Sequence, residues 1–294
     1  MRAAIVGVGV VGQALHRLIP DAVTYDSQHH PASRREQVNG CDLAFVCVPT
    51  PMAPDGSCDT SIVESVVDWL QTELIVIRST IAPGTTDRLR RQTGKRIVFQ
   101  PEYLGETVAH PMASVSRREF IVLGGPTVDV SPVADFYKRF YHSELQFYFC
   151  DAVTAEVAKY MENCFYAVKV TFCNEFFDIA QAFGVDFNLL REVWLADPRI
   201  SRDHTFVYPD QRGYDGKCLP KDVSAIIHAA RQRDCEPGLL AATARVNELI
   251  RARSAFGRAP DEAAKSPAPP AAEPTRRFAS QGLPEPLATG FRVD

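Results

Sequence analysis

The sequence predicts an α/β protein: a Rossmann-type, doubly wound parallel sheet at the N-terminal end, followed by an all-α region. Short apolar runs alternate with helical patterns up to about residue 150, which is typical of a parallel sheet with helices on both faces. A glycine-rich turn joins the first apolar run to the first helical pattern. A long helical stretch without proline or glycine then follows.

Strands and helices alternate through the first half of the chain. Residues 2–6 form a short apolar run that predicts a buried strand, and a helical pattern extends from the glycine turn to Leu18. Residues 60–71 are also helical in pattern. The other predicted strands are residues 22–25, the run DLAFVCVPTP at 42–51, residues 73–80, KRIVFQPEYLGE at 95–106 and REFIVLGG at 118–125. This order predicts βαβ units.

The pattern changes after residue 150. Residues 152–183 predict one long helix, and further helices are expected at 187–196 and at 220–253. Beyond residue 253 the chain is rich in alanine and proline, a composition that buries too little apolar surface to offset the entropy of ordering. We therefore expect three parts: a dinucleotide-binding domain at 1–150, a helical central domain at 151–253, and a disordered tail at 254–294.

Composition limits the classes of function. Hydrophobic residues make up 46% of the chain and charged residues 23%, with a net charge of -4, so nothing draws the protein generally to nucleic acid or to an anionic membrane. No apolar run has the ~20 residues that cross a bilayer, and the first residues lack a signal-peptide cleavage site, so we expect a cytoplasmic protein. Eight cysteines are scattered without a CxxC pair, which favours reduced thiols. Neither cysteines nor histidines show metal-ligand spacing, and no metal is expected.

The glycine-rich turn predicts a dinucleotide site. In GVGVVG, residues 7–12, the first glycine allows a tight turn, the second lets the backbone approach a pyrophosphate, and the third permits close helix–strand packing. Asp26 ends the second strand ~20 residues further on, where a carboxylate binds the ribose hydroxyls. This carboxylate would repel a ribose phosphate and so favours NAD over NADP. Arg34 and Arg35 are the residues nearby that argue for NADP.

Cys218 stands in an unusual setting, within QRGYDGKCLPKD. Pro220 suits the first turn of a helix, so Cys218 lies at or just before a helix N-terminus. The helix dipole, Lys217 and Lys221 all favour a thiolate there, which suits a nucleophile. The alternative is a small residue that fills a loop.

A thiolate beside NAD fits one reaction sequence. Hydride transfer from an alcohol gives an aldehyde, the thiolate adds to form a thiohemiacetal, a second hydride transfer gives a thioester, and water releases a carboxylate. Lys159 and Asn163 are four residues apart and share a helix face, where a cation and an amide donor can hold an alkoxide. Solvated helix surface is the alternative for both. Likewise Asp222 fits a first-turn helix charge, and Glu102 and Glu106 fit loop carboxylates.

An ordered set of motifs adds to these residues: GVGVVG, VCVPTP, RSTIAPGTT, QPEYLGE, AEVAKYMEN and GYDGKCLPKD. In this the chain resembles the UDP-glucose/GDP-mannose dehydrogenase family from residue 1 to about residue 252. The resemblance implies NAD as cofactor, a nucleotide sugar as substrate, and a homodimer formed through the long helix that begins at residue 152. It also implies Cys218 as the nucleophile and Glu102 as the acid/base carboxylate of the thioester half-reaction.

The resemblance assigns three groups of residues. Oxyanion stabilisation and placement of the hydrolytic water fall to Lys159, Asn163 and Asp222, with Thr80 nearby. The cofactor-binding set is Gly7, Val8, Gly9, Val10, Val11, Gly12, Asp26, Val48, Pro49, Thr50, Ser79, Thr80, Glu106 and Lys221. The substrate-binding set is Glu102, Tyr103, Leu104, Gly105, Glu106, Lys159, Asn163, Tyr208 and Gly213.

Two features depart from the family pattern. A second Rossmann-like domain grips the nucleotide of the substrate in the family, and here the Ala/Pro-rich tail stands in its place, which predicts a truncated member. Asp215 occupies a position where the family usually has glycine, and its carboxylate is unfavourable near an anionic nucleotide unless Lys217 offsets it.

Three hypotheses follow. The first is an NAD-dependent dehydrogenase that oxidises a primary alcohol to a carboxylate in two steps, with the C6 hydroxymethyl of a UDP-glucose-like nucleotide sugar as substrate and polysaccharide biosynthesis as the setting. A smaller substrate, or a partner chain that supplies the missing domain, fits the same chemistry. The second is a non-catalytic NAD-binding dimer with an interaction or regulatory role. The third is a single-step hydroxyacid dehydrogenase, which needs no thiol and leaves Cys218 unexplained.

Overall fold

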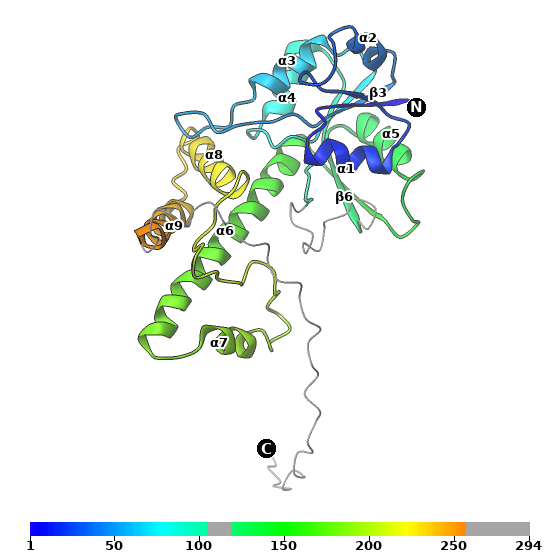
Figure 1. Ribbon diagram of the computed structural model, residues 1–294. Coiled ribbons are helices and arrows are strands. Elements are labelled where there is room, and N and C mark those ends of the chain that lie inside the picture. The colour runs from blue at the N-terminus through cyan, green and yellow to red at the C-terminus, as the bar shows by residue number, and fades with distance from the viewer. Residues whose placement is uncertain (105–118, 257–294) are drawn as a thin grey trace, which may run out of the picture. The chain divides into compact units, whose positions relative to one another are not determined.

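The computed structural model describes residues 1–104 and 119–256 (Figure 1). Residues Met1–Ala255 form one compact unit. The tail expected to be disordered was placed at 254–294; residues 254–256 belong to the last helix, and 257–294 lie outside the described residues. Within the described ranges, no helix is long and apolar enough to span a bilayer.

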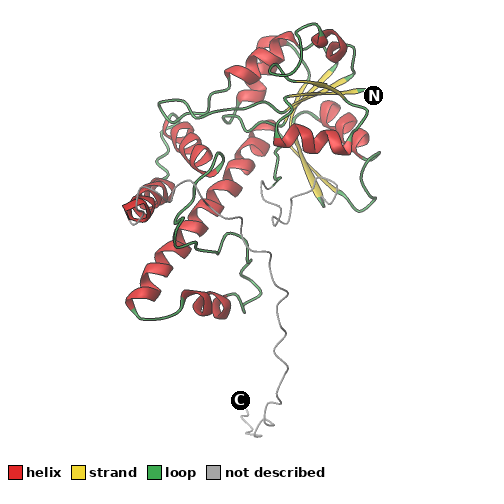
Figure 2. Ribbon diagram, in the orientation of Figure 1, coloured by secondary structure: helices red, strands yellow, loops and turns green. Residues whose placement is uncertain are grey.

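A seven-stranded sheet forms the N-terminal half, in the order β2-β1-β3-β4-β5-β6-β7. Figure 2 shows its strands in yellow, with helices in red on both sides. The first five strands pair in parallel, and the order reverses between β1 and β3. Ligands bind in open α/β sheets at such a switch point, beyond the carboxyl ends of the strands. The Rossmann-type prediction is confirmed. The strands are β1 (Ala3–Val6), β2 (Val23–Tyr25), β3 (Leu43–Val46), β4 (Leu74–Ile77), β5 (Ile97–Phe99), β6 (Phe120–Gly124) and β7 (Gln146–Cys150).

The sheet is parallel, as expected, at every strand pair except one. β6 runs antiparallel to β5 through the pair Phe99–Gly124, and β7 runs parallel to β6. An apolar strand does not reveal its direction, because its burial pattern is the same either way. β7 was also missed: its sequence QFYFC is largely exposed at the sheet edge and lacks the continuous apolar run of the central strands.

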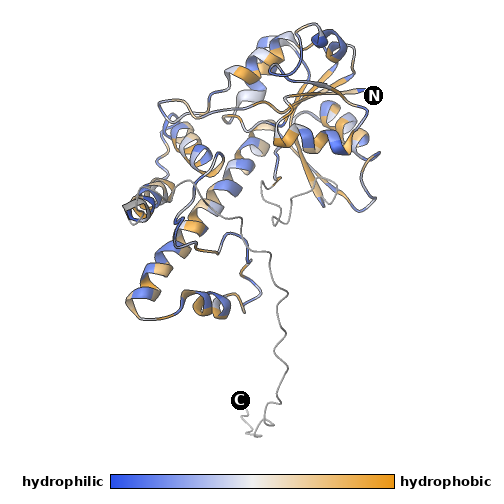
Figure 3. Cartoon of the chain, in the orientation of Figure 1, coloured by the Kyte–Doolittle hydropathy of each residue, from blue (hydrophilic) through white to orange (hydrophobic). Residues whose placement is uncertain are grey.

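Helices cover both faces of the sheet because alternate strand residues point to opposite sides. One set, which includes Ile5, Phe45 and Val76, packs against α1 and α5. The other set, which includes Ala44 and Ile75, packs against α2, α3, α4 and the start of α6. Figure 3 shows strands that are largely hydrophobic and helices with one hydrophobic and one hydrophilic side. The helices are α1 (Val10–Leu18), α2 (Arg34–Asn39), α3 (Ser61–Trp69), α4 (Thr85–Thr93) and α5 (Thr127–Tyr137).

The second half is helical, as predicted. It contains α6 (Ala152–Ala182), α7 (Phe187–Trp194), α8 (Leu219–Arg231) and α9 (Gly238–Phe256). The expectation of continuous helix over 220–253 is wrong, because the chain turns between Gln232 and Pro237. Asp234 there has φ 57°, a left-handed conformation, and Pro237 cannot continue a helix from the preceding turn. α6 packs against α4, β5 and β6 at its start and against α8 further along, so it links the sheet to the helical region.

Candidate active site

The glycine-rich turn after β1 lies at the switch point of the sheet. Gly7 has φ 90°, and a Cβ there would lie 2.5 Å from the carbonyl oxygen of Cys47, which follows β3. A Cβ on Gly12 would collide with the carbonyl of Gly7. A Cβ on Gly9 would meet nothing within 4 Å. Gly7 and Gly12 are therefore required by packing, while Gly9 faces open space at the start of α1, where a pyrophosphate can approach.

Asp26 faces this turn from the end of β2. Its carboxylate accepts hydrogen bonds from the backbone N–H of Val8 (2.9 Å) and of Gln28 (2.9 Å). These two bonds are the main reason that the pKa of Asp26 is lowered, so the ionised form that binds ribose hydroxyls is favoured.

The two arginines that argued for NADP are held by other contacts. Arg34 donates to the carbonyl of Thr24 at 2.7 Å. Arg35 donates to the hydroxyl of Tyr25 at 3.1 Å, and its guanidinium lies 4.8 Å from the centre of the Trp69 ring. Both side chains thus pack on β2 and α3, which leaves Asp26 as the acidic group that faces the turn and favours NAD.

The loops after β3 and β4 are joined by side-chain hydrogen bonds. Thr50 donates through its hydroxyl to the carbonyl of Thr80 (2.7 Å), and Ser79 donates to the carbonyl of Val48 (2.6 Å). Pro49 between them is exposed. Five members of the expected cofactor set therefore lie together at the carboxyl ends of adjacent strands, beside the glycine turn.

Cys218 is the N-cap residue of α8 and is exposed. None of the cysteines forms a disulfide in the described ranges, and only Cys235 shares this exposure. Burial raises the pKa of Cys47 to about 11 and that of Cys164 to about 12, which leaves those thiols unreactive at neutral pH. Cys235 lies in the turn between α8 and α9, so Cys218 is the exposed thiol at a helix N-terminus.

A chain of polar contacts joins α6 to α8. The ammonium of Lys159 donates to the Oδ1 atom of Asn163 (3.1 Å), and the Asn163 amide donates to the Oδ2 atom of Asp222 (2.5 Å). Lys221 donates to the other oxygen of Asp222 at 2.5 Å. Asn163 and Asp222 are buried. Four residues named from the sequence thus form one network across two helices.

Lys159 is the member of this network that connects to the rest of the site. Its ammonium lies 5.1 Å from the centre of the Tyr103 ring. Burial lowers the pKa of Lys159, and the charges of Glu162, Asp222 and Cys218 partly oppose that effect. The Cys218 thiol is therefore close enough to Lys159 for an electrostatic interaction between them.

Glu102 lies after β5 and is held in place by several donors. The backbone N–H groups of Tyr103 (2.8 Å) and Leu104 (2.7 Å) donate to its Oε1 atom. Arg78, 3% exposed at the end of β4, forms an ion pair with it and also donates to Tyr137. Arg78 was not predicted as a site residue, although an arginine within the apolar run LIVIRST was a signal that a buried charge partner was needed.

Some predicted substrate residues contact side chains outside the Lys159–Asn163–Asp222 network, and others lie outside the described residues. Tyr208 is exposed, and its ring stacks on Phe206. Gly213 has φ 77°, and a Cβ there would lie 2.5 Å from the side chain of Asn247, so this glycine allows the loop to pack on α9. Asp215 forms an ion pair with Arg251 on α9. Gly105 and Glu106 lie outside the described residues.

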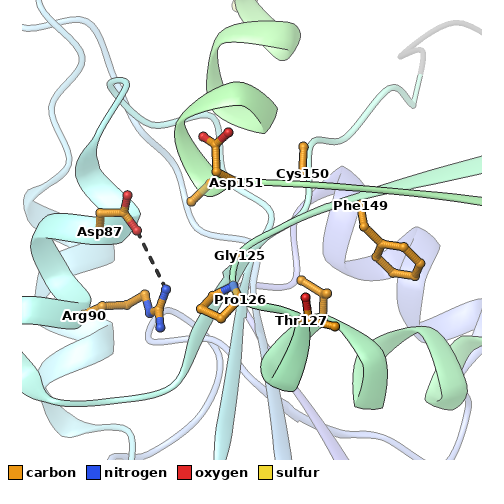
Figure 4. Close-up of a pocket in the computed structure, with 10 residues that line it drawn as sticks. Asp87, Arg90, Gly125, Pro126, Thr127, Phe149, Cys150 and Asp151 are labelled. Atoms are coloured by element: carbon orange, nitrogen blue, oxygen red, sulfur yellow. Dashed lines mark ion pairs between the residues drawn. The ribbon is translucent and has the colours of Figure 1, made fainter.

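A cavity of about 440 Å³ lies elsewhere, between α4, β7 and the first turns of α5 and α6 (Figure 4). Its lining includes Arg90, Phe149 and Asp151, and an ion pair joins Arg90 to Asp87 at 3.8 Å. None of the predicted site residues lines it. Across the described residues, no group of three or more His, Cys, Asp or Glu side chains is placed to hold a metal ion.

Comparison with protein families identifies both halves of the chain. Residues 7–143 match the NAD-binding domain of the UDP-glucose/GDP-mannose dehydrogenase family, and residues 153–249 match its central domain. The glycine turn, Asp26 and the joined loops lie in the first match. Lys159, the rest of the polar network and Cys218 lie in the second.

Individual relatives agree. A UDP-glucose 6-dehydrogenase of Haloferax volcanii is 31% identical over 235 residues, which cover 72% of this chain and 54% of that protein. The structure of a UDP-glucose dehydrogenase from Pyrobaculum islandicum aligns with a TM-score of 0.72 at 26% identity, over 84% of this chain and 68% of that one. A UDP-D-ManNAc dehydrogenase from Pyrococcus horikoshii aligns with a TM-score of 0.73 at 25% identity, over 87% and 70%. The chain spans about half the length of the curated relatives it matches.

Proposed function

The chain belongs to the UDP-glucose/GDP-mannose dehydrogenase family, and on that premise we propose that it oxidises the primary alcohol of a nucleotide sugar to a carboxylate in two NAD-dependent steps. Cys218 holds the half-oxidised product. The observation that carries this proposal is the placement of an exposed thiol at the N-terminus of α8, within electrostatic reach of Lys159 and its network.

The reaction balances with two molecules of NAD and one of water. NAD, when bound, accepts a hydride in each step. The alcohol loses a hydride and a proton, and the Cys218 thiolate adds to the resulting aldehyde to form a thiohemiacetal. A second loss of hydride and proton gives a thioester. Water cleaves the C–S bond, which releases the carboxylate and returns the thiol. The products per alcohol are one carboxylate, two NADH and three protons.

Lys159 and Asn163 are proposed to stabilise the negative oxygen that develops at each stage. An ammonium held in a half-buried position acts on an alkoxide more strongly than a fully solvated one. The amide of Asn163 is fixed between Lys159 and Asp222, so its dipole is already oriented before the reaction. Asp222 is proposed to orient the hydrolytic water as well as the amide.

Glu102 is proposed as the base of the thioester half-reaction. Arg78 and two backbone N–H groups fix the position of its carboxylate, and a general base must be held at a defined distance from the attacking water. Thr80, joined to Thr50 at the end of β4, is proposed to lie beside the reacting carbon.

The cofactor is proposed to lie across the glycine turn, with Asp26 at the ribose and the loops after β3 and β4 along its length. The open space above Gly9 and the ionised Asp26 fit NAD. Lys221 is proposed to contact it from α8. The corresponding division of the chain is an NAD-binding domain at 1–150 and a central domain at 151–253.

A homodimer through α6 is part of the proposal. Six large apolar residues are exposed along this 31-residue helix and a seventh at its C-cap, separated by three, four or seven positions, so they share one face. They are Val157, Met161, Phe165, Phe172, Phe176, Ile179 and Phe183. An apolar stripe of this length on a helix fits burial against a second copy of the same surface.

The test is turnover by the purified chain. The chain is incubated with NAD and with UDP-glucose, GDP-mannose, other UDP- and GDP-sugars, and the free sugars, and both NADH and the carboxylate are measured. We expect two NADH per carboxylate for at least one nucleotide sugar, and no carboxylate from Cys218→Ala. Cys235→Ala is the matched control, since it removes the other exposed thiol, and it should keep full activity. No NADH from any substrate would refute the proposed reaction.

A further inference from the structure

Glu156 is a fully buried carboxylate near the start of α6, and it has no part in the polar network around Asp222. Its exposed fraction is 0%. One oxygen accepts hydrogen bonds from the backbone N–H (2.9 Å) and the hydroxyl (2.6 Å) of Thr86. The other accepts from the backbone N–H of Gly84 at 2.5 Å. All three donors lie at the beginning of a different helix, α4.

This carboxylate replaces a local cap. The first N–H groups of a helix have no partners within the helix, and a side chain of the N-cap residue usually accepts from them. The N-cap of α4 is Gly84, with φ 92°, and it has no side chain to do so. Burial raises the pKa of Glu156, and the hydrogen bonds from Thr86 and Gly84 oppose that effect. A carboxylate buried here depends on all three donors.

The contact joins two parts of the proposed site. α4 begins directly after the loop at 79–84, which carries Ser79 and Thr80. α6 carries Lys159 three residues beyond Glu156 and Asn163 seven residues beyond it, about one and two helical turns away. A single side chain therefore links the loop expected to contact the cofactor to the helix face expected to hold the alkoxide.

We propose that Glu156 is a positioning residue, which fixes the face of α6 that bears Lys159 and Asn163 relative to the loop that bears Ser79 and Thr80. The inference rests on the proposed function, because Glu156 acts through those residues and touches neither substrate nor cofactor. Without the carboxylate, the two elements keep their apolar packing but lose the directional contact that sets their register. A displacement of 1 Å in such an arrangement costs on the order of 100-fold in rate.

Two variants break the contact from opposite sides. Glu156→Gln is nearly isosteric, but it replaces one acceptor oxygen with an N–H₂ group that faces another donor. Thr86→Val removes the hydroxyl donor and keeps the shape. Thr86→Ser retains the hydroxyl and should retain wild-type behaviour. Thr171→Val is the matched control, because Thr171 is also buried and its hydroxyl donates only within α6, to the carbonyl of Ala167.

The decisive measurement is kcat in a double-mutant cycle with Lys159→Met. We expect Glu156→Gln and Thr86→Val each to lower kcat about 10- to 100-fold, and Thr86→Ser and Thr171→Val to leave it unchanged. In the Lys159→Met background the Glu156→Gln effect on kcat should become clearly smaller, since one of the two residues it positions is gone and only Asn163 remains. An effect of the same size in both backgrounds would overturn the inference and leave Glu156 with a purely structural role.

A second readout separates this inference from the proposed reaction. If the wild-type chain gives no NADH with any substrate, the proposed function fails. The affinity for NAD then tests whether Glu156 positions the loop that carries Ser79 and Thr80. Calorimetric titration should show a Kd for NAD about fivefold higher in Glu156→Gln and Thr86→Val. The loss of one hydrogen bond leaves the loop at 79–84 less ordered, and NAD must then order it on binding. The same Kd in all variants would overturn the inference.

Discussion

The three glycines of GVGVVG differ in how much space surrounds the position where a Cβ atom would lie. At Gly12 a methyl group would meet the backbone of Gly7, and backbone cannot move aside cheaply. At Gly9 there is room for a methyl group in the absence of cofactor. The same substitution at these two positions should therefore damage different properties of the protein.

We predict that Gly12→Ala lowers stability by about 1–3 kcal/mol, because overpacking strains the turn. Gly9→Ala should keep the wild-type Tm and instead weaken NAD binding by roughly tenfold or more, because its methyl group occupies the space of the pyrophosphate. Thermal unfolding and NAD titration of both variants check this pair. A Gly9→Ala protein that binds NAD normally would show that the cofactor does not cross this turn.

Lys159 sets a pH limit on the reaction. Burial lowers its pKa below the ordinary 10.5, so the ammonium loses its proton at a lower pH than a solvated lysine would. An alkoxide is stabilised only by the charged form. We therefore expect kcat to fall on the alkaline side at a pH below 10.5.

Two substitutions test that assignment. Lys159→Arg keeps the charge at every accessible pH, so the alkaline decline should move to higher pH. Lys159→Met should lower kcat by about 100- to 1,000-fold across the whole profile. If the alkaline decline stays in place in Lys159→Arg, another group causes it.

At the scale of helices and strands, α6 connects the sheet to the helical region, and its sequence pattern was the clearest of all the elements. Its long pattern without proline or glycine predicted a helix at 152–183, and the structure has it at Ala152–Ala182. Elements with weaker patterns were missed. α4 has the polar sequence TTDRLRRQT, α5 contains Pro132, and β7 lies at an exposed edge. Tertiary contacts fix these elements, and local sequence does not record such contacts.

The apolar stripe on α6 gives a prediction about assembly. We expect the chain to be a dimer, and Phe165→Glu to raise the dissociation constant of that dimer by roughly 100-fold or more. In a symmetric dimer the substitution removes the Phe165 ring from both copies of the interface. Analytical ultracentrifugation over a range of concentrations measures this. Leu239→Glu, an exposed apolar position on α9, is the matched control and should stay dimeric. Dissociation in both variants, or in neither, would place the interface elsewhere.

For the whole molecule, the sequence predicted members of the candidate site but not the contacts between them. The spacing of Lys159 and Asn163 placed them on one face, but their link to Asp222, 59 residues beyond Asn163, depends on how α6 packs on α8. Arg78 and Glu156 were missed for the same reason. Each is a buried ionisable side chain whose partners come from distant segments, and a partner of that kind becomes visible only when the chain is folded.

Cofactor choice is also a property of the folded molecule. NAD at about 100 times its Kd should raise Tm by roughly 5–10 °C, because ligand binding to the native state adds about 2.7 kcal/mol of stability. NADP at the same concentration should give a smaller shift, since its phosphate would approach the Asp26 carboxylate. Thermal unfolding with each cofactor measures the difference. Equal shifts would show that Asp26 does not discriminate.

The most direct test of the account is intact-protein mass spectrometry of the Cys218→Ser variant, after incubation with NAD and the nucleotide sugar that the wild-type chain oxidises. An oxygen ester is hydrolysed more slowly than a thioester in a site built around sulfur, so we predict a covalent adduct with the mass of the oxidised substrate, located by peptide mapping at position 218. Carboxylate formed at the wild-type rate by Cys218→Ala, with no adduct on Cys218→Ser, would contradict the account, because the reaction would then proceed without a covalent bond between the half-oxidised product and the protein.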